Sequence, residues 1–140
     1  MRADTRSRRP RDRERERALW AWEQISKVRK QSNQGKYAGL VRKLPTLLQV
    51  NGLGQTAAFL AAKGGIGRSS RSEGDNPHGI LYRQLEDYLR MLLERERAGR
   101  EMMEIILNLS PSRYRRVSRE IQIVAGWLKR FADAELVEEE

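Results

Sequence analysis

The chain has 140 residues, which is enough for one domain with a single hydrophobic core. It contains no cysteine, so disulfides, thiolate metal sites and cysteine nucleophiles are excluded. No run approaches the roughly 18 consecutive apolar residues of a membrane-spanning helix, and no secretory signal follows the arginine-rich start. The net charge of +9 favours a polyanionic partner such as a nucleic acid, although it would also suit surface arginine–glutamate pairs. We expect a soluble, cytoplasmic protein.

Residues 1–17 form an arginine-rich segment with eight arginines and four carboxylates, a net charge of +4. Its apolar content is too low for a core, so we expect disorder at its start, while a first helix could begin near Arg11. We expect a helical domain over residues 18–136 and an acidic tail over residues 137–140. The first helix should end near Gln31, and its buried stripe is predicted to be Ala18, Leu19, Trp22, Ile25 and Val28.

Apolar residues then recur at helical spacing from Tyr37 to Leu48. Pro45 lies inside this pattern, where it removes a backbone hydrogen bond and should kink the helix. The Asn51-Gly52 pair interrupts the pattern, which resumes as a short helix ending near Lys63. Residues 64–76 are rich in glycine and serine, so they predict a flexible loop.

Two further helices are predicted to begin where a capping residue precedes proline, at residues 76–77 and 110–111. Gly99 either breaks the first of them or weakens it before the apolar residues 102–109. The buried stripes are predicted to be Leu81, Leu85, Tyr88, Leu89 and Leu92 in the first, and Tyr114, Val117, Ile121, Val124, Leu128 and Phe131 in the second. No segment alternates with period two, so the sequence predicts an all-α, single-domain bundle of five or six helices.

The sequence offers no set of residues for catalysis, a metal or a cofactor. His78 is the only histidine and lies in the first turn of a predicted helix, where a packing role is more common than a role as general base. Paired carboxylates such as Glu86 and Asp87 lie among arginines, which favours solvated ion pairs. The glycines near Gly52 follow a predicted helix, whereas a dinucleotide fingerprint follows a strand. We therefore expect a protein without enzymatic activity.

The last predicted helix carries candidate contact residues on the face opposite its buried stripe. Arg115, Arg119 and Arg130 fall on this face, with Ile123 and Trp127 beside them. These two apolar residues either form a protein interface or are covered by another helix of the bundle. The candidates for contact with RNA phosphates are Arg42, Lys43, Lys63, Arg115, Arg119 and Arg130.

Two segments resemble one known family. The first is the run YAGLVRKLPTLLQVNGLGQTAAFLAAK at residues 37–63, and the second contains Tyr114, Glu120 and WLKRFADA at residues 127–134. Together they resemble the small helical subunit of the type III-B CRISPR effector, the Cmr complex. The resemblance covers residues 18–136 approximately, and it does not extend to the arginine-rich segment or to the loop at 64–76.

The resemblance implies a non-catalytic structural subunit. Its expected partners are other Cmr subunits, further copies of itself, the guide crRNA and the target RNA, with no membrane partner. Several copies would stack as a minor filament, and guide–target pairing would read the sequence. The alternative is a stand-alone basic nucleic-acid-binding helical protein, for which Asn108 and Gln122 are the best base-reading candidates. A small enzyme is a third possibility without a candidate site.

The two ends of the chain carry opposite charges, which suggests how copies would stack. Residues 1–17 have a net charge of +4, whereas residues 133–140 hold five carboxylates and no cation. Attraction between unlike ends would favour head-to-tail contacts that leave the assembly open. In this hypothesis Ile123 and Trp127 supply buried area close to the contact.

Overall fold

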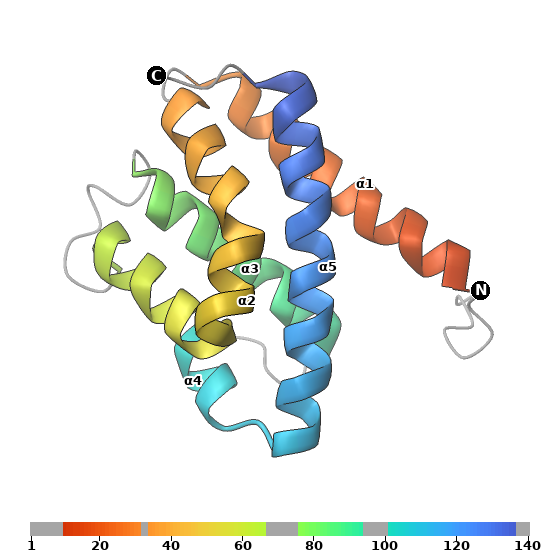
Figure 1. Ribbon diagram of the computed structural model, residues 1–140, viewed down its shortest axis with the longest axis vertical. Helices are drawn as coiled ribbons and strands as arrows, with labels where there is room; N and C mark the ends of the chain where they lie inside the picture. Colours follow the sequence, from red (N-terminus) through yellow and green to blue (C-terminus); the bar gives the residue numbers. More distant parts are fainter. Residues whose placement is uncertain (1–9, 32–33, 67–75, 94–100, 137–140) are drawn as a thin grey trace.

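The computed structural model describes residues 10–31, 34–66, 76–93 and 101–136, and within these ranges it contains five α-helices and no strand (Figure 1). The predicted all-α, single-domain bundle is confirmed. In chain order the helices are α1 (Pro10–Arg29), α2 (Gln34–Gly64), α3 (Pro77–Leu93), α4 (Met102–Leu107) and α5 (Pro111–Glu135).

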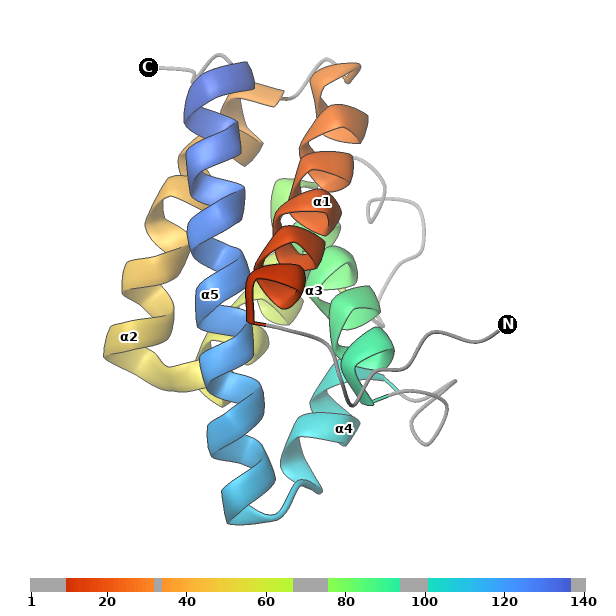
Figure 2. The same cartoon turned by 90° about the vertical axis from the view of Figure 1, so that its right-hand side faces the viewer.

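The long helix α5 lies against two other helices. Both α1 and α2 pack along it, whereas α3 and α4 pack mainly against α2. The helices α1 and α5 run side by side in the same direction (Figure 2), as the ion pairs Arg17–Glu120 and Arg29–Glu135 indicate. Residues that are more than 100 positions apart in the sequence therefore form one face of the molecule.

One hydrophobic core includes buried side chains from all five helices. The buried hydroxyl of Tyr37 on α2 donates a hydrogen bond to Gln84 Oε1 on α3 at 2.5 Å. Burial raises the pKa of Tyr37, so its hydroxyl stays neutral and keeps donating. The largest fully buried side chains are Ile25, Tyr37, Leu44, Leu60, Leu81, Tyr82, Leu85, Leu89, Met102, Ile105, Ile121 and Leu128.

The predicted stripe of the first helix is confirmed at Ile25 and Val28, which are buried, but it is wrong at Leu19 and Trp22. Trp20 is buried, whereas Leu19 is 57% exposed and Trp22 is 39% exposed. The Trp20 ring lies 4.8 Å from the ring of Tyr88, and this contact turns the preceding residue outward. Tryptophan occurs on both faces of α1, so the spacing of apolar residues alone does not identify the buried face. A smaller error occurs at the end of α3, where Leu93 is buried in place of Leu92.

The first helix also begins earlier than the expected domain boundary at residue 18. Helix α1 starts at Pro10, close to the alternative start near Arg11, so residues 10–17 are helical. Residues 1–9, 67–75, 94–100 and 137–140 lie outside the described residues. The disorder predicted at the N-terminus, the flexible loop, the effect of Gly99 and the acidic tail therefore stay predictions.

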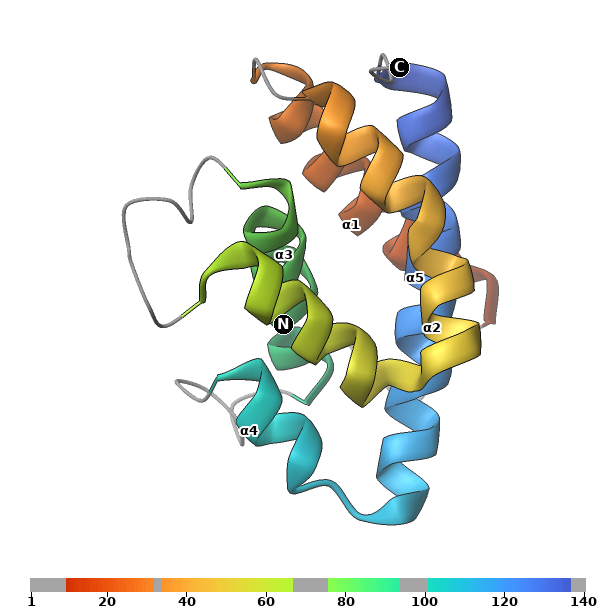
Figure 3. The ribbon, with the colours of Figure 1, turned by 60° about the vertical axis from the view of Figure 1, so that its left-hand side comes forward.

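The two arms of α2 meet at Gly52 (Figure 3), which confirms the interruption predicted at Asn51-Gly52. Gly52 has φ 85° and ψ 168°, a region that residues with a side chain rarely adopt. Across the bend, Thr56 Oγ1 donates to the carbonyl of Leu47 at 3.1 Å. The hydroxyl of Tyr114 on α5 accepts a bond from Gly54 N at 3.0 Å. Gly52 is the residue of α2 with non-helical backbone angles, and Pro45 lies inside the helix. The kink expected at Pro45 stays a prediction.

Candidate interaction surfaces

The outer face of α5 presents three of the predicted cationic residues. Helix α5 begins with Pro111 after Ser110, whose hydroxyl oxygen accepts a bond from Arg113 N at 3.3 Å, as the cap motif predicts. Arg115, Arg119 and Arg130 are exposed. None of the three has an ion-pair partner among the residues that the structure describes. Their charges are available to an anionic partner.

A second basic surface forms where the end of α2 meets the start of α3. Lys43 and Lys63 are both exposed, and both lie close enough to His78 to act on its charge. Burial lowers the pKa of His78, and these two lysines lower it further. The two lysines are 20 positions apart, on different arms of the bent helix α2, and both act on His78. The side-chain amide of Asn76 donates to the carbonyl of Lys63 at 2.9 Å, which ties the two helix ends together.

His78 packs where the end of α2 meets the start of α3. Its ring meets the ring of Phe59 edge-on, with the centroids 5.5 Å apart. Gly79, the next residue, approaches Gly64 so closely that a Cβ on Gly64 would lie 2.6 Å from the Gly79 Cα. A glycine is therefore needed where the end of α2 crosses the start of α3.

Arg42 differs from the other candidate cations because an acid already pairs with it. Its Nε lies 3.3 Å from Asp133 Oδ1, and Lys129 Nζ lies 3.5 Å from the other carboxylate oxygen. The hypothesis that the two oppositely charged ends of the chain attract each other treats Asp133 and Glu135 as free charges of the C-terminal end. Both are paired inside the described fold, Glu135 with Arg29. That hypothesis therefore loses two of its five carboxylates, and the other three lie outside the described residues.

The apolar candidates Ile123 and Trp127 are half-buried, because α1 covers part of their face. The Trp127 ring lies 5.5 Å from Phe131, and Phe131 lies 5.2 Å from Trp22 on α1. Trp127 therefore belongs to a row of rings that reaches α1 through Phe131, which agrees with the alternative in which another helix covers it. An interface role for Ile123 and Trp127 stays a prediction.

The two base-reading candidates of the alternative function make hydrogen bonds inside the fold. The side-chain amide of Gln122 donates to the carbonyl of Pro45 on α2 at 2.9 Å. The amide of Asn108 donates to the carbonyl of Glu104 at 2.7 Å. Both donors are used structurally, so neither residue supports sequence reading of a nucleic acid.

Glu120 joins three helices through hydrogen bonds that the sequence analysis did not predict. Arg17 on α1 donates to both of its carboxylate oxygens, at 2.6 and 2.9 Å. The hydroxyl of Tyr88 on α3 donates to one of them at 3.0 Å. Burial raises the pKa of Glu120, but the bonds from Arg17 and Tyr88 outweigh burial and hold that pKa below its ordinary value. The carboxylate stays charged and fixes α1 against α3 and α5.

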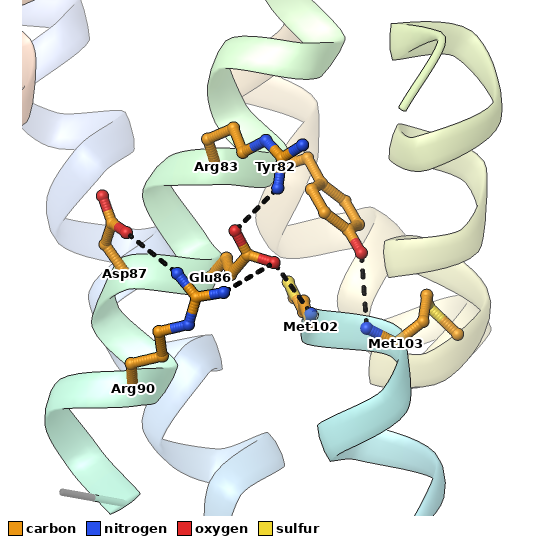
Figure 4. A network of polar contacts seen from close by, with 7 residues as sticks. All are labelled: Tyr82, Arg83, Glu86, Asp87, Arg90, Met102 and Met103. Carbon is orange, nitrogen blue, oxygen red and sulfur yellow. Dashed lines mark hydrogen bonds and ion pairs between the residues drawn. The ribbon is translucent and has the colours of Figure 1, made fainter. Parts of the chain in front are cut away.

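Glu86 plays a related part at the start of α4 (Figure 4). Its side chain is almost fully buried and accepts a bond from the backbone N–H of Met102 at 2.8 Å. Two arginines on its own helix balance the charge, Arg83 at 2.9 Å and Arg90 at 3.6 Å. The residue that precedes α4 supplies no side-chain cap, so Glu86 takes that role from a neighbouring helix.

A groove of about 920 Å³ lies between the first turns of α1, the last turns of α3 and the N-terminal half of α5. Its lining includes one carboxylate, Glu120, which Arg17 already binds. Its aliphatic surface comes from Leu92, Leu93, Val117 and Ile123. Five arginines surround it: Arg13, Arg17, Arg113, Arg116 and Arg119. Only Arg119 among these was predicted as a contact residue, because the other helices that build the groove could not be placed from the sequence.

The described residues also bear on membrane and metal binding. Within the described ranges, no helix is long and apolar enough to cross a membrane. The same residues contain no group of three or more histidine, aspartate or glutamate side chains arranged to hold a metal ion.

The fold and its surfaces define an all-α protein with two exposed basic surfaces and an arginine-lined groove. A family model described as CRISPR-associated protein (Cas_Cmr5) matches residues 13–135. The CRISPR system Cmr subunit Cmr5 of Thermus thermophilus is 32% identical over 125 residues, which cover 86% of this chain and 95% of that protein. The chain belongs to the Cmr5 family of CRISPR-associated proteins.

The fold is also similar to a solved structure of the family. The crystal structure of a CRISPR-associated Cmr5 family protein from Thermus thermophilus matches with a TM-score of 0.67 and 28% sequence identity. The match covers 90% of this chain and 98% of that one. The resemblance inferred from residues 37–63 and 114–134 is thereby confirmed at the level of the family.

Proposed function

We propose that this protein is a non-catalytic structural subunit of a type III-B CRISPR effector, the Cmr complex, and acts in the cytoplasm. Copies of it stack as a minor filament along the guide–target RNA, which they contact through phosphates. Other subunits carry out cleavage. Family membership supports the assignment to the complex, and the relative from Thermus thermophilus is named as a Cmr subunit.

The observation that carries the RNA contact is the row of exposed arginines on α5. Arg115, Arg119 and Arg130 lie on one helix and have no acidic partner among the described residues. Phosphate contacts by such residues position a nucleic acid without reading its sequence. The internal hydrogen bonds of Asn108 and Gln122 agree with binding that does not read the sequence, because these two side chains already make hydrogen bonds inside the fold.

The test is a change of all three α5 arginines to alanine in the complex reconstituted with crRNA and target RNA. Removal of each phosphate contact should reduce the slope of log affinity against log salt by roughly 0.7 for single strands. The matched control changes Lys27, Lys30 and Lys36 to alanine. These lysines are exposed, so their substitution removes the same positive charge from another part of the molecule.

The proposal requires that the arginine variant bind RNA with a smaller salt slope, while the lysine control resembles the wild type. Equal slopes in both variants would show that the α5 arginines do not contact RNA. Absence of the protein from a purified complex that retains the other subunits would contradict its role as a subunit.

A further inference from the structure

The groove between α1, α3 and α5 shares Arg119 with the proposed RNA contacts, but the rest of its lining is not used by them. Among the described residues, five arginines and one carboxylate line it, and Arg17 binds that carboxylate through two hydrogen bonds. Arg116 and Arg119 have no ion-pair partner within the described ranges. The groove therefore presents a concave, arginine-rich surface that also contains aliphatic side chains.

This lining suits an acidic peptide better than a nucleic acid. Proteins that bind single-stranded nucleic acids usually stack bases on aromatic rings, and the described residues that line the groove include no aromatic side chain. The same described lining contains no asparagine or glutamine that would bind base edges. Aliphatic side chains such as Leu92 and Val117 gain nothing from a phosphate, but they can bury an aliphatic residue of a peptide.

The chain itself contains a segment of the complementary kind. Residues 137–140 read Val-Glu-Glu-Glu, one aliphatic residue followed by three carboxylates. Arginine forms strong, often bidentate hydrogen bonds with carboxylates, so several arginines around one groove fit this segment. The aliphatic side chain of Val137 could pack against the aliphatic side chains of the lining.

The backbone of this segment is too short to reach the groove arginines of its own α5. Helix α5 rises about 1.5 Å per residue, which places Leu136 about 26 Å along the axis from Arg119, the nearest groove arginine on this helix. Four extended residues span at most about 14 Å. The other groove arginines on α5, Arg113 and Arg116, lie still farther from the segment.

We propose that the groove binds residues 137–140 of a second copy of this chain. The groove borders the N-terminal half of α5, whereas residues 137–140 follow the C-terminal end of this helix in the sequence, so the contact joins two different surfaces. Contacts of this kind leave one groove and one acidic segment unused, and further copies can add in the same direction. This contact would supply the stacking in the proposed function, but it needs neither RNA nor another subunit.

The first test uses the isolated full chain and a labelled peptide of residues 134–140. Binding is measured by fluorescence anisotropy at about 50 mM salt, where screening is weak. Changing Arg116 and Arg119 to glutamate should weaken peptide binding about tenfold or more. The control changes Arg115 and Arg130 to glutamate, which gives the same net charge on the same helix outside the groove. A peptide with glutamine at its last three positions should bind neither protein.

A charge exchange between two variants tests the contact in the full chain. Arg116→Glu with Arg119→Glu should abolish self-association, and so should Glu138→Lys with Glu139→Lys and Glu140→Lys. In a mixture, the glutamates in the groove of one variant can meet the lysines at residues 138–140 of the other. The unchanged groove of the second variant can likewise meet the unchanged acidic segment of the first. Sedimentation velocity should therefore detect assemblies in the mixture that neither variant forms alone.

Two results would overturn the inference. One is equal loss of peptide binding in the groove variant and its control, which would indicate general attraction to a basic protein. The other is a mixture that fails to associate. If the groove variant loses binding of a short oligouridine but not of the peptide, the groove is an RNA site, and the inference fails while the proposed RNA function stands.

Discussion

Glu86 and Glu120 are both carboxylates that hold helices together, but their partners come from different places. Glu86 is paired with Arg83 and Arg90, which lie one turn away on the same helix, and it caps α4 through a backbone N–H. Glu120 is bound by Arg17, which is 103 positions away in the sequence, and by Tyr88.

The difference shows two ways to keep a charged group inside a small bundle. The arginines beside Glu86 are in place as soon as α3 forms, so that its charge is balanced locally and α4 docks afterwards. Glu120 obtains its partner only when α1 lies against α5. Loss of Glu86 should therefore weaken the junction of α3 and α4, whereas loss of Glu120 should loosen α1 and the side of the groove that α1 builds.

The largest effect is expected from Glu86→Ala. This change leaves the Met102 N–H and part of two guanidinium groups without their acceptor, so it should lower the free energy of unfolding by about 3 kcal/mol. Urea unfolding followed by circular dichroism measures the change. Asp87→Ala is the matched control, because Asp87 is exposed and pairs with Arg90 at 3.9 Å, near the limit for an ion pair. Equal effects of both substitutions would contradict a capping role for Glu86.

A somewhat smaller effect is expected when the bond between α1 and α5 is removed. Arg17→Ala and Glu120→Ala should each lower the free energy of unfolding by about 2 kcal/mol, because both side chains are mostly shielded from water. In a double-mutant cycle the two changes should be coupled by about 1 kcal/mol or more. Additive effects would mean that the two side chains stabilise the fold separately. Hydrogen exchange should increase in α1 and not in α4.

The same contact predicts how stability depends on pH. The pKa of Glu120 lies below its ordinary value of 4.5 in the folded state, so its contribution is complete above that ordinary value. The contribution should decrease as the pH falls through the lower, folded-state pKa. Glu120→Gln lacks this titration, so the stability difference between wild type and variant should shrink in acid. A difference that stays constant from neutral pH down to about pH 3 would contradict this account.

The contrast between the two carboxylates also explains what could be predicted from the sequence. The caps at Ser110-Pro111 and Asn76-Pro77 and the interruption at Gly52 depend on neighbouring residues, so local rules placed them correctly. The buried face of α1 depends on a contact between Trp20 and Tyr88, which no local pattern encodes. Local spacing therefore gave the helices but misplaced Leu19 and Trp22.

The candidate surfaces followed the same rule. Exposure of Arg115, Arg119 and Arg130 could be predicted, because it follows from the phase of one amphipathic helix. The pairing of Arg42 with Asp133 could not, because it joins residues of two helices whose packing was unknown. The groove escaped prediction for the same reason, since three helices contribute to it.

The smallest effect is expected from the exposed ion pairs at the end of α5. Asp133→Asn removes the contacts with Arg42 and Lys129, and all three side chains are at least 39% exposed. Water and salt screen such pairs, so the change should lower the free energy of unfolding by about 0.5 kcal/mol or less. Thermal unfolding at low and at high salt measures it, with Asp87→Asn as a control for a single exposed charge.

This last substitution separates two roles for the C-terminal end of α5. If Asp133 only completes a surface pair, Asp133→Asn should change neither stability nor self-association by a measurable amount. If self-association falls while stability does not, Asp133 faces a neighbouring copy, and the contact surface extends beyond residues 137–140. A decrease of about 2 kcal/mol or more, on the order expected for Glu120, would show that exposed and shielded carboxylates contribute alike, which contradicts the dependence of these contributions on burial.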